Sequence, residues 1–226
     1  MRAIIIAAGE GSRWGDYTGV PKHLVKVDGE PILYRTIRLL KENSVNEIIV
    51  VGPLDSRYNP NGVNLFVPVK HQEYADADKF LSSEILWNHV GRTITLFGDV
   101  FFSKDAITKI VSNNRTSWTV FGRSGRSEFT GTPYGEIFAH SFFPNDIPKH
   151  KECLNILVDA VKAKDAKKGN GWEHYKVMRG VRGRDIKKSK NIIDENFIEI
   201  DDWTEDFDFP EDYDRFIERR NHKDKQ

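Results

Sequence analysis

The sequence has little of several features that mark specialised classes of protein. It contains one cysteine, Cys153, which excludes an intrachain disulfide framework and a cysteine zinc site and suits a reducing compartment. Lys and Arg (34) balance Asp and Glu (34), so the charge gives no reason to expect binding to nucleic acid or to an anionic membrane. Apolar runs reach only about six residues, far short of the roughly 20 of a membrane span. We expect a soluble, cytoplasmic protein that binds neither nucleic acid nor a membrane.

Signatures of several common chemistries are also missing. The seven histidines show no H-E-x-x-H pair, and no nucleophilic Ser-His-Asp arrangement is visible. No G-x-x-x-x-G-K-S/T motif is present, which argues against P-loop chemistry.

Strand and helix patterns alternate through residue 122. Short β-branched runs predict buried strands, whereas apolar residues at helical spacing predict helices between them. The expected strands are 2–7, 47–52, 63–69, 93–99 and 117–122, and the expected helices are 31–43, 82–90 and 105–114. This order predicts an α/β fold of three layers, in which helices cover both faces of a mostly parallel sheet.

The pattern changes after residue 122. A polar loop (123–135) precedes an expected strand at 136–143, a helix at 152–166 and a last strand at 196–200. We expect a single domain, 1–226, in which about 123–190 form a small insertion on the sheet.

The first candidate site is the glycine-rich segment 7–13, which directly follows the first expected strand. Ligands of open parallel sheets bind beyond the carboxyl ends of strands, where glycines let backbone N–H groups approach phosphates closely. Such loops also occur merely to turn the chain. The dinucleotide pattern G-x-G-x-x-G is not met, because the glycine after Gly11 is Gly15, one place late.

The segment 7–33 resembles the signature of the nucleotidylyltransferases. That signature is an apolar strand, A-A-G-x-G-x-R, a lysine beside proline, and V-x-G-x-P-L opening a helix. The matching residues are Ala7, Ala8, Gly9, Gly11, Arg13, Pro21, Lys22, Gly29 and Pro31. The form S-R-x-x-x-x-T-x-x-P-K-x-L, with Ser12, Thr18 and Leu24, is most similar to the bacterial phosphocholine cytidylyltransferase type.

The resemblance implies a Rossmann-like nucleotidyltransferase fold and a nucleotide site built on this loop. The nucleotide-binding residues that it implies are Ala7, Ala8, Gly9, Glu10, Gly11, Ser12, Arg13, Lys22, Ser82 and Asp99. Ser82 is the weakest of them, because it is equally well explained as a helix N-cap. Catalytic roles fall on Lys22, Arg13 and Asp99, with Lys22 and Arg13 neutralising phosphate charge.

Two carboxylates are candidates for a Mg²⁺ site, because Mg²⁺ takes oxygen ligands and accompanies triphosphates. Asp99 ends a strand in a segment that resembles the family's G-D-x motif. The segment 206–213 resembles D-x-D-T-P-E-D-L, which places the second ligand on Asp208, with Asp206 as second choice. The alternative for Asp208 is a solvated, acidic helix start.

The resemblance implies Mg²⁺-dependent transfer of a nucleotide, with CTP expected, to a small phosphorylated acceptor, with release of pyrophosphate. It also implies a role in capsule or cell-surface polysaccharide synthesis. Two alternative hypotheses are a nucleotide-sugar glycosyltransferase and a catalytically silent nucleotide sensor.

The acceptor stays open between phosphocholine, phosphorylated amino acids, alditol phosphates and sugar phosphates. Four aromatic residues could cage a quaternary ammonium or could belong to the core: Trp118, Trp172, Tyr175 and Trp203. The basic stretch 162–190 could hold the acceptor phosphate or form a solvated face. The sequence does not indicate the oligomeric state.

Overall fold

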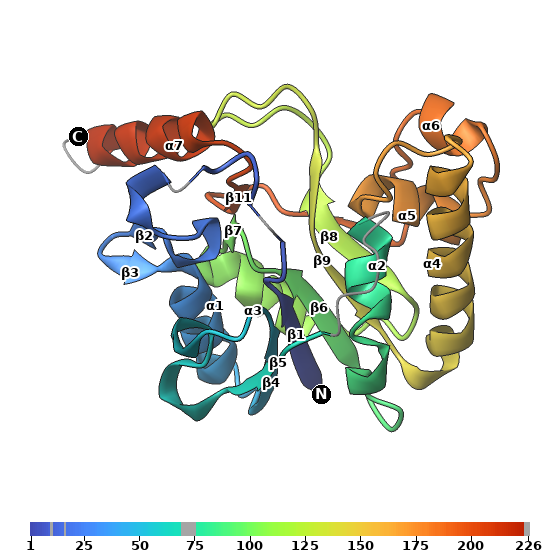
Figure 1. Cartoon of the computed structure of the whole chain (residues 1–226), viewed down its shortest axis with the longest axis horizontal. Helices are drawn as coiled ribbons and strands as arrows, with labels where there is room; N and C mark the ends of the chain where they lie inside the picture. The colour runs from blue at the N-terminus through green and yellow to red at the C-terminus, as the bar shows by residue number, and fades with distance from the viewer. Residues whose placement is uncertain (10, 16, 69–75, 224–226) are drawn as a thin grey trace.

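Figure 1 shows the computed structural model of the chain, which describes residues 1–9, 11–15, 17–68 and 76–223. Within these ranges the main sheet has seven strands. They are β1 (Arg2–Ile6), β4 (Glu47–Val51), β5 (Asn64–Phe66), β6 (Thr93–Phe97), β8 (Thr119–Arg123), β9 (Glu136–Phe142) and β10 (Phe197–Glu199). Their order is β10-β8-β9-β6-β1-β4-β5.

Most neighbouring strands run parallel. β1 pairs in parallel with β4 and β6, β4 with β5, and β10 with β8. β9 alone among the strands described in this sheet runs antiparallel to its two neighbours, β6 and β8. The predicted α/β fold with a mostly parallel, mixed sheet is therefore confirmed.

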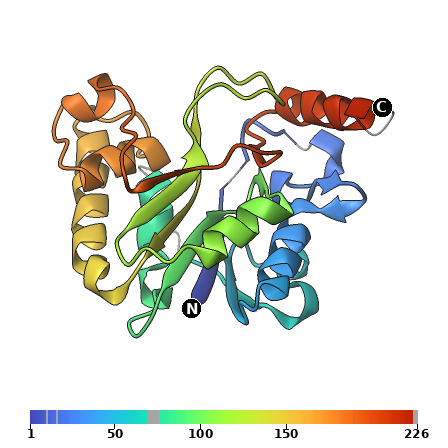
Figure 2. The same ribbon diagram turned by 180° about the vertical axis from the view of Figure 1, so that it is seen from behind.

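Helices cover both faces of the sheet, because alternate residues of a strand point to opposite sides. Ala3 and Ile5 of β1 pack against α1 (Ile32–Glu42) and α3 (Lys104–Ser112). Ile4 and Ile6 face the opposite core cluster. The helices of that face are α2 (Asp76–Leu81), α4 (Ile147–Lys162), α5 (Gly171–Met178) and α6 (Asp185–Lys188). Figure 2 shows α1 and α3 on the near side of the sheet.

A third group of elements lies beyond the carboxyl ends of the central strands (Figure 1). It comprises the short pairs β2 (Lys26–Val27) with β3 (Glu30–Pro31) and β7 (Val100–Phe101) with β11 (Glu205–Asp206), together with α7 (Pro210–Lys223). Trp14, Phe101, Phe207 and Phe216 form the core of this group. The last helix is thereby fixed above the edge of the sheet where the candidate site is expected.

Short 3₁₀ helices complete the chain. They are η1 (Tyr17–Gly19), η2 (Lys22–Leu24), η3 (Ser56–Tyr58), η4 (Pro60–Gly62), η5 (Glu84–Leu86) and η6 (Pro144–Asp146). Across the described ranges, every helix is too short or too polar to cross a membrane.

The predicted helix at 82–90 is wrong. The α-helix ends at Leu81, and one 3₁₀ turn, η5, follows. The Asn88 side chain accepts hydrogen bonds from the N–H groups of Val90 and Gly91, which turns the chain. Trp87 is buried against Phe142. Burial of this indole and the turn at Asn88 override the local helical pattern.

The segment 123–190 contributes directly to the sheet and its cover. β9 is a central strand, and α4 begins at Ile147, earlier than the predicted 152. The helices α5 and α6 lie within a stretch for which the sequence predicted no regular structure. Asn170 caps α5 by accepting a hydrogen bond from the Glu173 N–H.

Candidate active site

The glycine loop, residues 7–13, continues β1 at its carboxyl end. The Ala7 N–H donates to the Val51 carbonyl at 2.8 Å, which ties the loop to the neighbouring strand. The Trp14 N–H donates to the carbonyl of Gly11, whose φ of +60° suits glycine. The buried Trp14 indole donates to the carbonyls of Tyr17 and Val20 at 3.0 Å. Trp14 therefore anchors the loop that Arg13 ends.

Glu10 and Ser82 differ from the other residues expected to bind nucleotide. Glu10 lies outside the described residues. Ser82 is not a helix N-cap, because it follows the end of α2; its hydroxyl donates to the Lys79 carbonyl at 2.8 Å. A residue that the sequence did not single out, Lys79, reaches the loop instead. Its ammonium would lie 3.9 Å from a Cβ atom built on Gly9.

Gly98 allows the end of β6 to approach the end of β1. A Cβ atom there would lie 2.8 Å from the Cβ of Ala7 and 2.9 Å from the carbonyl oxygen of Ile6. The Gly98 N–H donates to the same carbonyl at 2.8 Å. The next residue, Asp99, is thus brought to the edge of the glycine loop.

Pairing of β7 with β11 brings three carboxylates together. Asp206 pairs with Val100, and the Phe207 N–H donates to the Asp99 carbonyl at 3.3 Å. One oxygen atom each of Asp99, Asp206 and Asp208 lies within 4.8 Å of the others. We call these three residues the carboxylate cluster. It unites Asp99 with both of the carboxylates between which the sequence left the second position open.

Two cations contact the carboxylate cluster. The Lys22 ammonium, buried at the start of η2, donates to Asp99 and lies 3.9 Å from Oδ1 of Asp208. The Arg13 guanidinium donates to Oδ2 of Asp208 at 2.6 Å and lies 5.0 Å from the centre of the Phe209 ring. The site therefore brings together residues from three separate parts of the sequence: Arg13 and Lys22, Asp99, and Asp208.

Burial and charge set the protonation of this site. Burial opposes ionisation of Asp99, but the Lys22 ammonium outweighs it and lowers the pKa of Asp99 to about 2. Burial likewise opposes the charge of Lys22, yet Asp99 and Asp206 raise the pKa of Lys22 above its usual value. Lys22 is therefore a permanent cation and Asp99 a permanent anion at neutral pH.

The remaining carboxylates experience the opposite balance. Burial, followed by the charges of Asp99 and Asp208, raises the pKa of Asp206 well above its usual value. Burial and then Asp208 raise the pKa of Glu136, at the start of β9, to about 8. The site thus holds more acidic groups than its two cations neutralise, which favours uptake of a further cation.

Oδ1 of Asp206 is buried without a hydrogen-bond partner among the described residues. A buried polar atom without a partner is rare in folded proteins, and this oxygen has a lone pair available for a ligand. The surrounding donor set is made of carboxylate oxygens, the ligands that Mg²⁺ prefers. The residues present therefore fit a Mg²⁺ ion.

The four aromatic residues considered for a cation cage do not converge. Trp118, Trp172 and Tyr175 belong to the core between the sheet and α4–α5. Trp203 instead stacks on Phe129, with 4.2 Å between the ring centres, and packs against the apolar core beneath α7. The cage is therefore wrong, and the alternative of core residues holds for the first three.

The basic stretch 162–190 also lies away from the carboxylate cluster. It contains α5 and α6, which Figure 1 shows beside one end of α4, whereas the carboxylate cluster lies at β7 and β11. Lys176 donates to the carbonyls of Ile186 and Ser189, and Arg179 pairs with Asp194 at 2.6 Å. These two cations hold the segment together rather than gather around a ligand.

Comparison with known proteins gives this geometry a family context. The family described as the MobA-like NTP transferase domain matches residues 3–120, which hold the glycine loop, Lys22 and Asp99. A bifunctional IPC transferase and DIPP synthase of Thermococcus kodakarensis is 56% identical over 59 residues, 26% of this chain and 12% of that protein. A choline-phosphate cytidylyltransferase of Streptococcus pneumoniae is 33% identical over 111 residues, 46% of this chain and 47% of that protein.

A solved structure extends the likeness of the fold to the whole chain. The CTP:phosphocholine cytidylyltransferase of Streptococcus pneumoniae superposes with a TM-score of 0.59 at 19% identity, covering 97% of this chain and 98% of that one. By sequence, the chain spans less than half the length of both curated relatives that it is compared with here.

Proposed function

The chain belongs to the MobA-like NTP transferase domain family, and from that premise we propose that it transfers CMP from CTP to a small phosphorylated acceptor and releases pyrophosphate. One observation carries the proposal. The carboxylate cluster, Lys22 and Arg13 meet beside the glycine loop, beyond the carboxyl ends of the strands. Backbone N–H groups, cations and clustered carboxylates at one edge suit a nucleoside triphosphate and its metal.

The choice of CTP rests on the relatives. The Streptococcus pneumoniae protein is named a cytidylyltransferase, and its match with this chain spans 111 residues. The sequence form around Ser12, Thr18 and Leu24 supports the same choice.

The reaction needs positioning and charge neutralisation more than proton transfer. An oxygen of the acceptor phosphate attacks the α-phosphorus of CTP in line. The bond between the α-phosphorus and the bridging oxygen to the β-phosphorus breaks, and its electron pair leaves with pyrophosphate. A phosphate dianion is already a competent nucleophile, so no general base is required.

The chain's own residues would divide the work by position. Lys22 would neutralise charge that develops on the α-phosphate, because it is buried and always charged. Arg13, half exposed at the end of the loop, would hold the leaving phosphates. Asp99 would be the main anchor of Mg²⁺, with Asp208 and Asp206 completing the set. When bound, Mg²⁺ supplies neutralisation of phosphate charge.

The test is a pyrophosphate-release assay with Mg²⁺. It crosses the four ribonucleoside triphosphates with phosphocholine, sugar 1-phosphates, glycerol phosphate and phosphorylated amino acids. We expect pyrophosphate from CTP with one acceptor class. Asp99→Asn should lower turnover by at least about 10²-fold, since it removes the main metal anchor.

Asp159→Asn is the matched control, because this carboxylate on α4 has an 80% exposed side chain. It should keep normal turnover. Release of a nucleoside diphosphate instead of pyrophosphate would favour a glycosyltransferase. Equal turnover in Asp99→Asn and the parent would refute the proposed site.

A further inference from the structure

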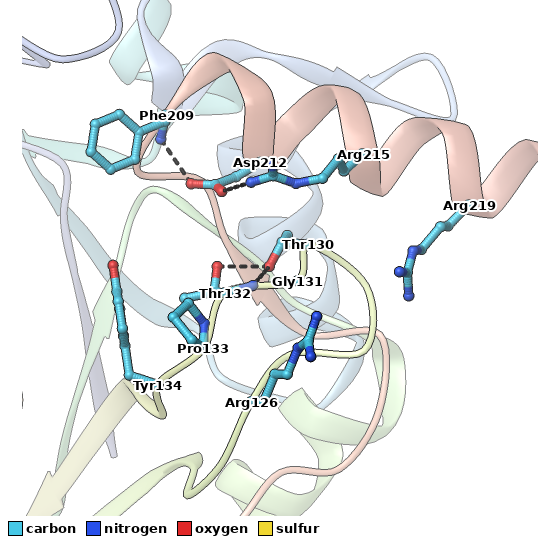
Figure 3. Close-up of a pocket in the computed structure, with 10 residues that line it drawn as sticks. All are labelled: Arg126, Thr130, Gly131, Thr132, Pro133, Tyr134, Phe209, Asp212, Arg215 and Arg219. Atoms are coloured by element: carbon cyan, nitrogen blue, oxygen red, sulfur yellow. Dashed lines mark hydrogen bonds and ion pairs between the residues drawn. The ribbon is translucent and has the colours of Figure 1, made fainter.

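A pocket opens between α7 and the loop that joins β8 to β9 (Figure 3). Its volume is about 450 Å³, enough for a small metabolite. Ten residues line it: Arg126, Thr130, Gly131, Thr132, Pro133, Tyr134, Phe209, Asp212, Arg215 and Arg219. We call it the arginine pocket.

The charge of the arginine pocket is unbalanced. Arg126, Arg215 and Arg219 contribute three positive charges and Asp212 one negative charge, a net charge of +2 in a chain whose total is zero. Arg215 pairs with Asp212 at 2.8 Å. Arg126 and Arg219 form no ion pair with any residue that the structure describes. Figure 3 shows these two guanidinium groups directed toward one another from opposite walls.

The loop wall of the pocket is held by a buried network. Arg123 pairs with Glu205 at 2.6 Å, and the Ser127 hydroxyl donates to the same carboxylate. Oγ of Ser127 in turn accepts from the N–H groups of Phe129 and Thr130 at 3.0 and 2.9 Å. The loop carrying Arg126 is therefore preorganised.

The opposite wall is equally defined. The carboxylate of Asp212, which is buried in the first turn of α7, accepts from the Phe209 N–H at 3.0 Å. Arg219 follows two turns later on the same helix. A rigid helix thus presents one free arginine, and a pinned loop presents the other.

The arginine pocket borders the carboxylate cluster through residues adjacent in the sequence. Phe209 lines the pocket, directly follows Asp208, and lies under the guanidinium of Arg13. Tyr134 lines the pocket two residues before Glu136. Burial and then the charges of Glu136 and Asp208 raise the pKa of Tyr134.

We propose that the arginine pocket binds an anionic group of the acceptor, a carboxylate or a second phosphate, so that Arg126 and Arg219 select acceptors with two anionic groups. Each guanidinium group can bind a carboxylate or phosphate through two hydrogen bonds, so two that point toward one another can hold an anion between them. The assignment of the ligand as the acceptor rests on the proposed function; the presence of an anion site does not.

The test measures equilibrium dissociation constants by calorimetry on the full chain with two pairs of probes. Glycerol 3-phosphate and 3-phosphoglycerate differ by one carboxylate, and glucose 1-phosphate and glucose 1,6-bisphosphate differ by one phosphate. In at least one pair, the probe with two anionic groups should bind the parent at least about tenfold more tightly. The pair that shows the preference identifies the anionic group.

Removing both arginines should abolish this preference. In R126A/R219A the two members of the pair should bind within about twofold of one another, with binding of the probe that has one anionic group unaffected. Arg115→Ala, at an exposed position outside the pocket, should keep the full preference. Arg219→Lys should retain part of it, because it keeps the charge and loses the bidentate geometry. This single, conservative variant tests the pocket even if the double variant is unstable.

Two results would overturn the proposal: no preference in the parent for either pair, or an unchanged preference in R126A/R219A. Pyrophosphate release is measured separately on the same samples. A preference that disappears in R126A/R219A, without any pyrophosphate release, would keep the anion site and refute cytidylyl transfer. Pyrophosphate release with acceptors that have one anionic group, and no preference between the probes, would refute the arginine pocket alone.

Discussion

The glycine loop and the arginine pocket lie at the same edge of the sheet but are built in opposite ways. The glycine loop is tied to β4 through the Ala7 N–H, and its cation Lys22 is buried against Asp99. In the arginine pocket, Arg126 and Arg219 are exposed and have no acidic partner among the described residues. A site that must neutralise charge during chemistry holds its ions in place, whereas a site that selects a ligand leaves its charge available.

We expect the largest effect from a variant that removes a charge beside the glycine loop. Lys22→Gln should lower turnover by about 10²- to 10³-fold, because it removes a buried, preorganised cation from the α-phosphate. It also leaves the half-buried Asp99 without its partner, so the free energy of unfolding should fall as well. Turnover is measured by pyrophosphate release, and stability by urea unfolding.

Lys26→Gln is the control for this variant. Lys26 lies four residues further on, in β2, with an exposed side chain. It should keep both turnover and stability. Turnover of Lys22→Gln within about threefold of the parent would mean that the buried cation plays no part in the chemistry, against the usual cost of removing such a group.

The two regions also differed in how far the sequence predicted them. A local pattern predicted the glycine loop, Lys22 and Asp99, because each of them closely follows a strand or a proline. Asp206 and Asp208 could not be separated by sequence, because both join the carboxylate cluster through pairing of β11 with β7. Arg126 and Arg219 were missed, because 93 positions separate them and only the placement of α7 brings them together.

Lys79 and the helix at 82–90 illustrate a second limit of the sequence. The apolar spacing of 82–90 resembles a helix, but the buried Trp87 and the turn at Asn88 end it after one 3₁₀ turn. The helix lies earlier, at Asp76–Leu81, and directs Lys79 toward Gly9. Tertiary burial, which a local pattern does not contain, decided both outcomes.

The contrast continues in the two cores on either side of the sheet. The core beneath α1 and α3 holds one buried histidine, His23 beside Tyr58, whereas the core beneath α4 and α5 contains three, His140, His150 and His174. His150 accepts a hydrogen bond from the Trp118 indole at 3.0 Å, while both ring nitrogens of His140 lack partners among the described residues. Burial lowers the pKa of His140 to about 3.

This lowered pKa predicts loss of stability in acid. Below about pH 6.5 the unfolded chain binds protons that the folded chain excludes, so stability falls as the pH drops from 6.5 toward 3. Each such histidine contributes up to about 1.4 kcal/mol per pH unit. The measurement is the free energy of unfolding in urea at several pH values.

His140→Phe should flatten this dependence, because it removes one titrating ring and keeps an aromatic one beside Trp118. His89→Phe, at an exposed position, should leave the slope unchanged. Equal slopes in the parent and in His140→Phe would show that the ring of His140 gains a proton without unfolding.

Gly98→Ala sharpens the comparison on the side of the glycine loop. The added methyl would overlap the Cβ of Ala7 at 2.8 Å and the Ile6 carbonyl oxygen at 2.9 Å, and this backbone atom cannot move aside easily. Overpacking of this kind costs about 1–3 kcal/mol. Urea unfolding should show that loss, and the Michaelis constant for CTP should rise. Gly125→Ala is the control, because a Cβ atom at Gly125 would meet no other atom within 4 Å; it should change neither quantity.

The smallest expected effect concerns Phe209, which belongs to both regions. Its ring lies 5.0 Å from the Arg13 guanidinium and also lines the arginine pocket. An exposed cation–π contact contributes about 0.5–1 kcal/mol, so Phe209→Leu should raise the Michaelis constant for CTP by about two- to fivefold. The constant for the acceptor should rise by a similar factor, because the same ring forms the wall of the pocket. A change in only one of the two constants would mean that the glycine loop and the arginine pocket act independently. Phe209→Tyr, which keeps the ring, should restore both.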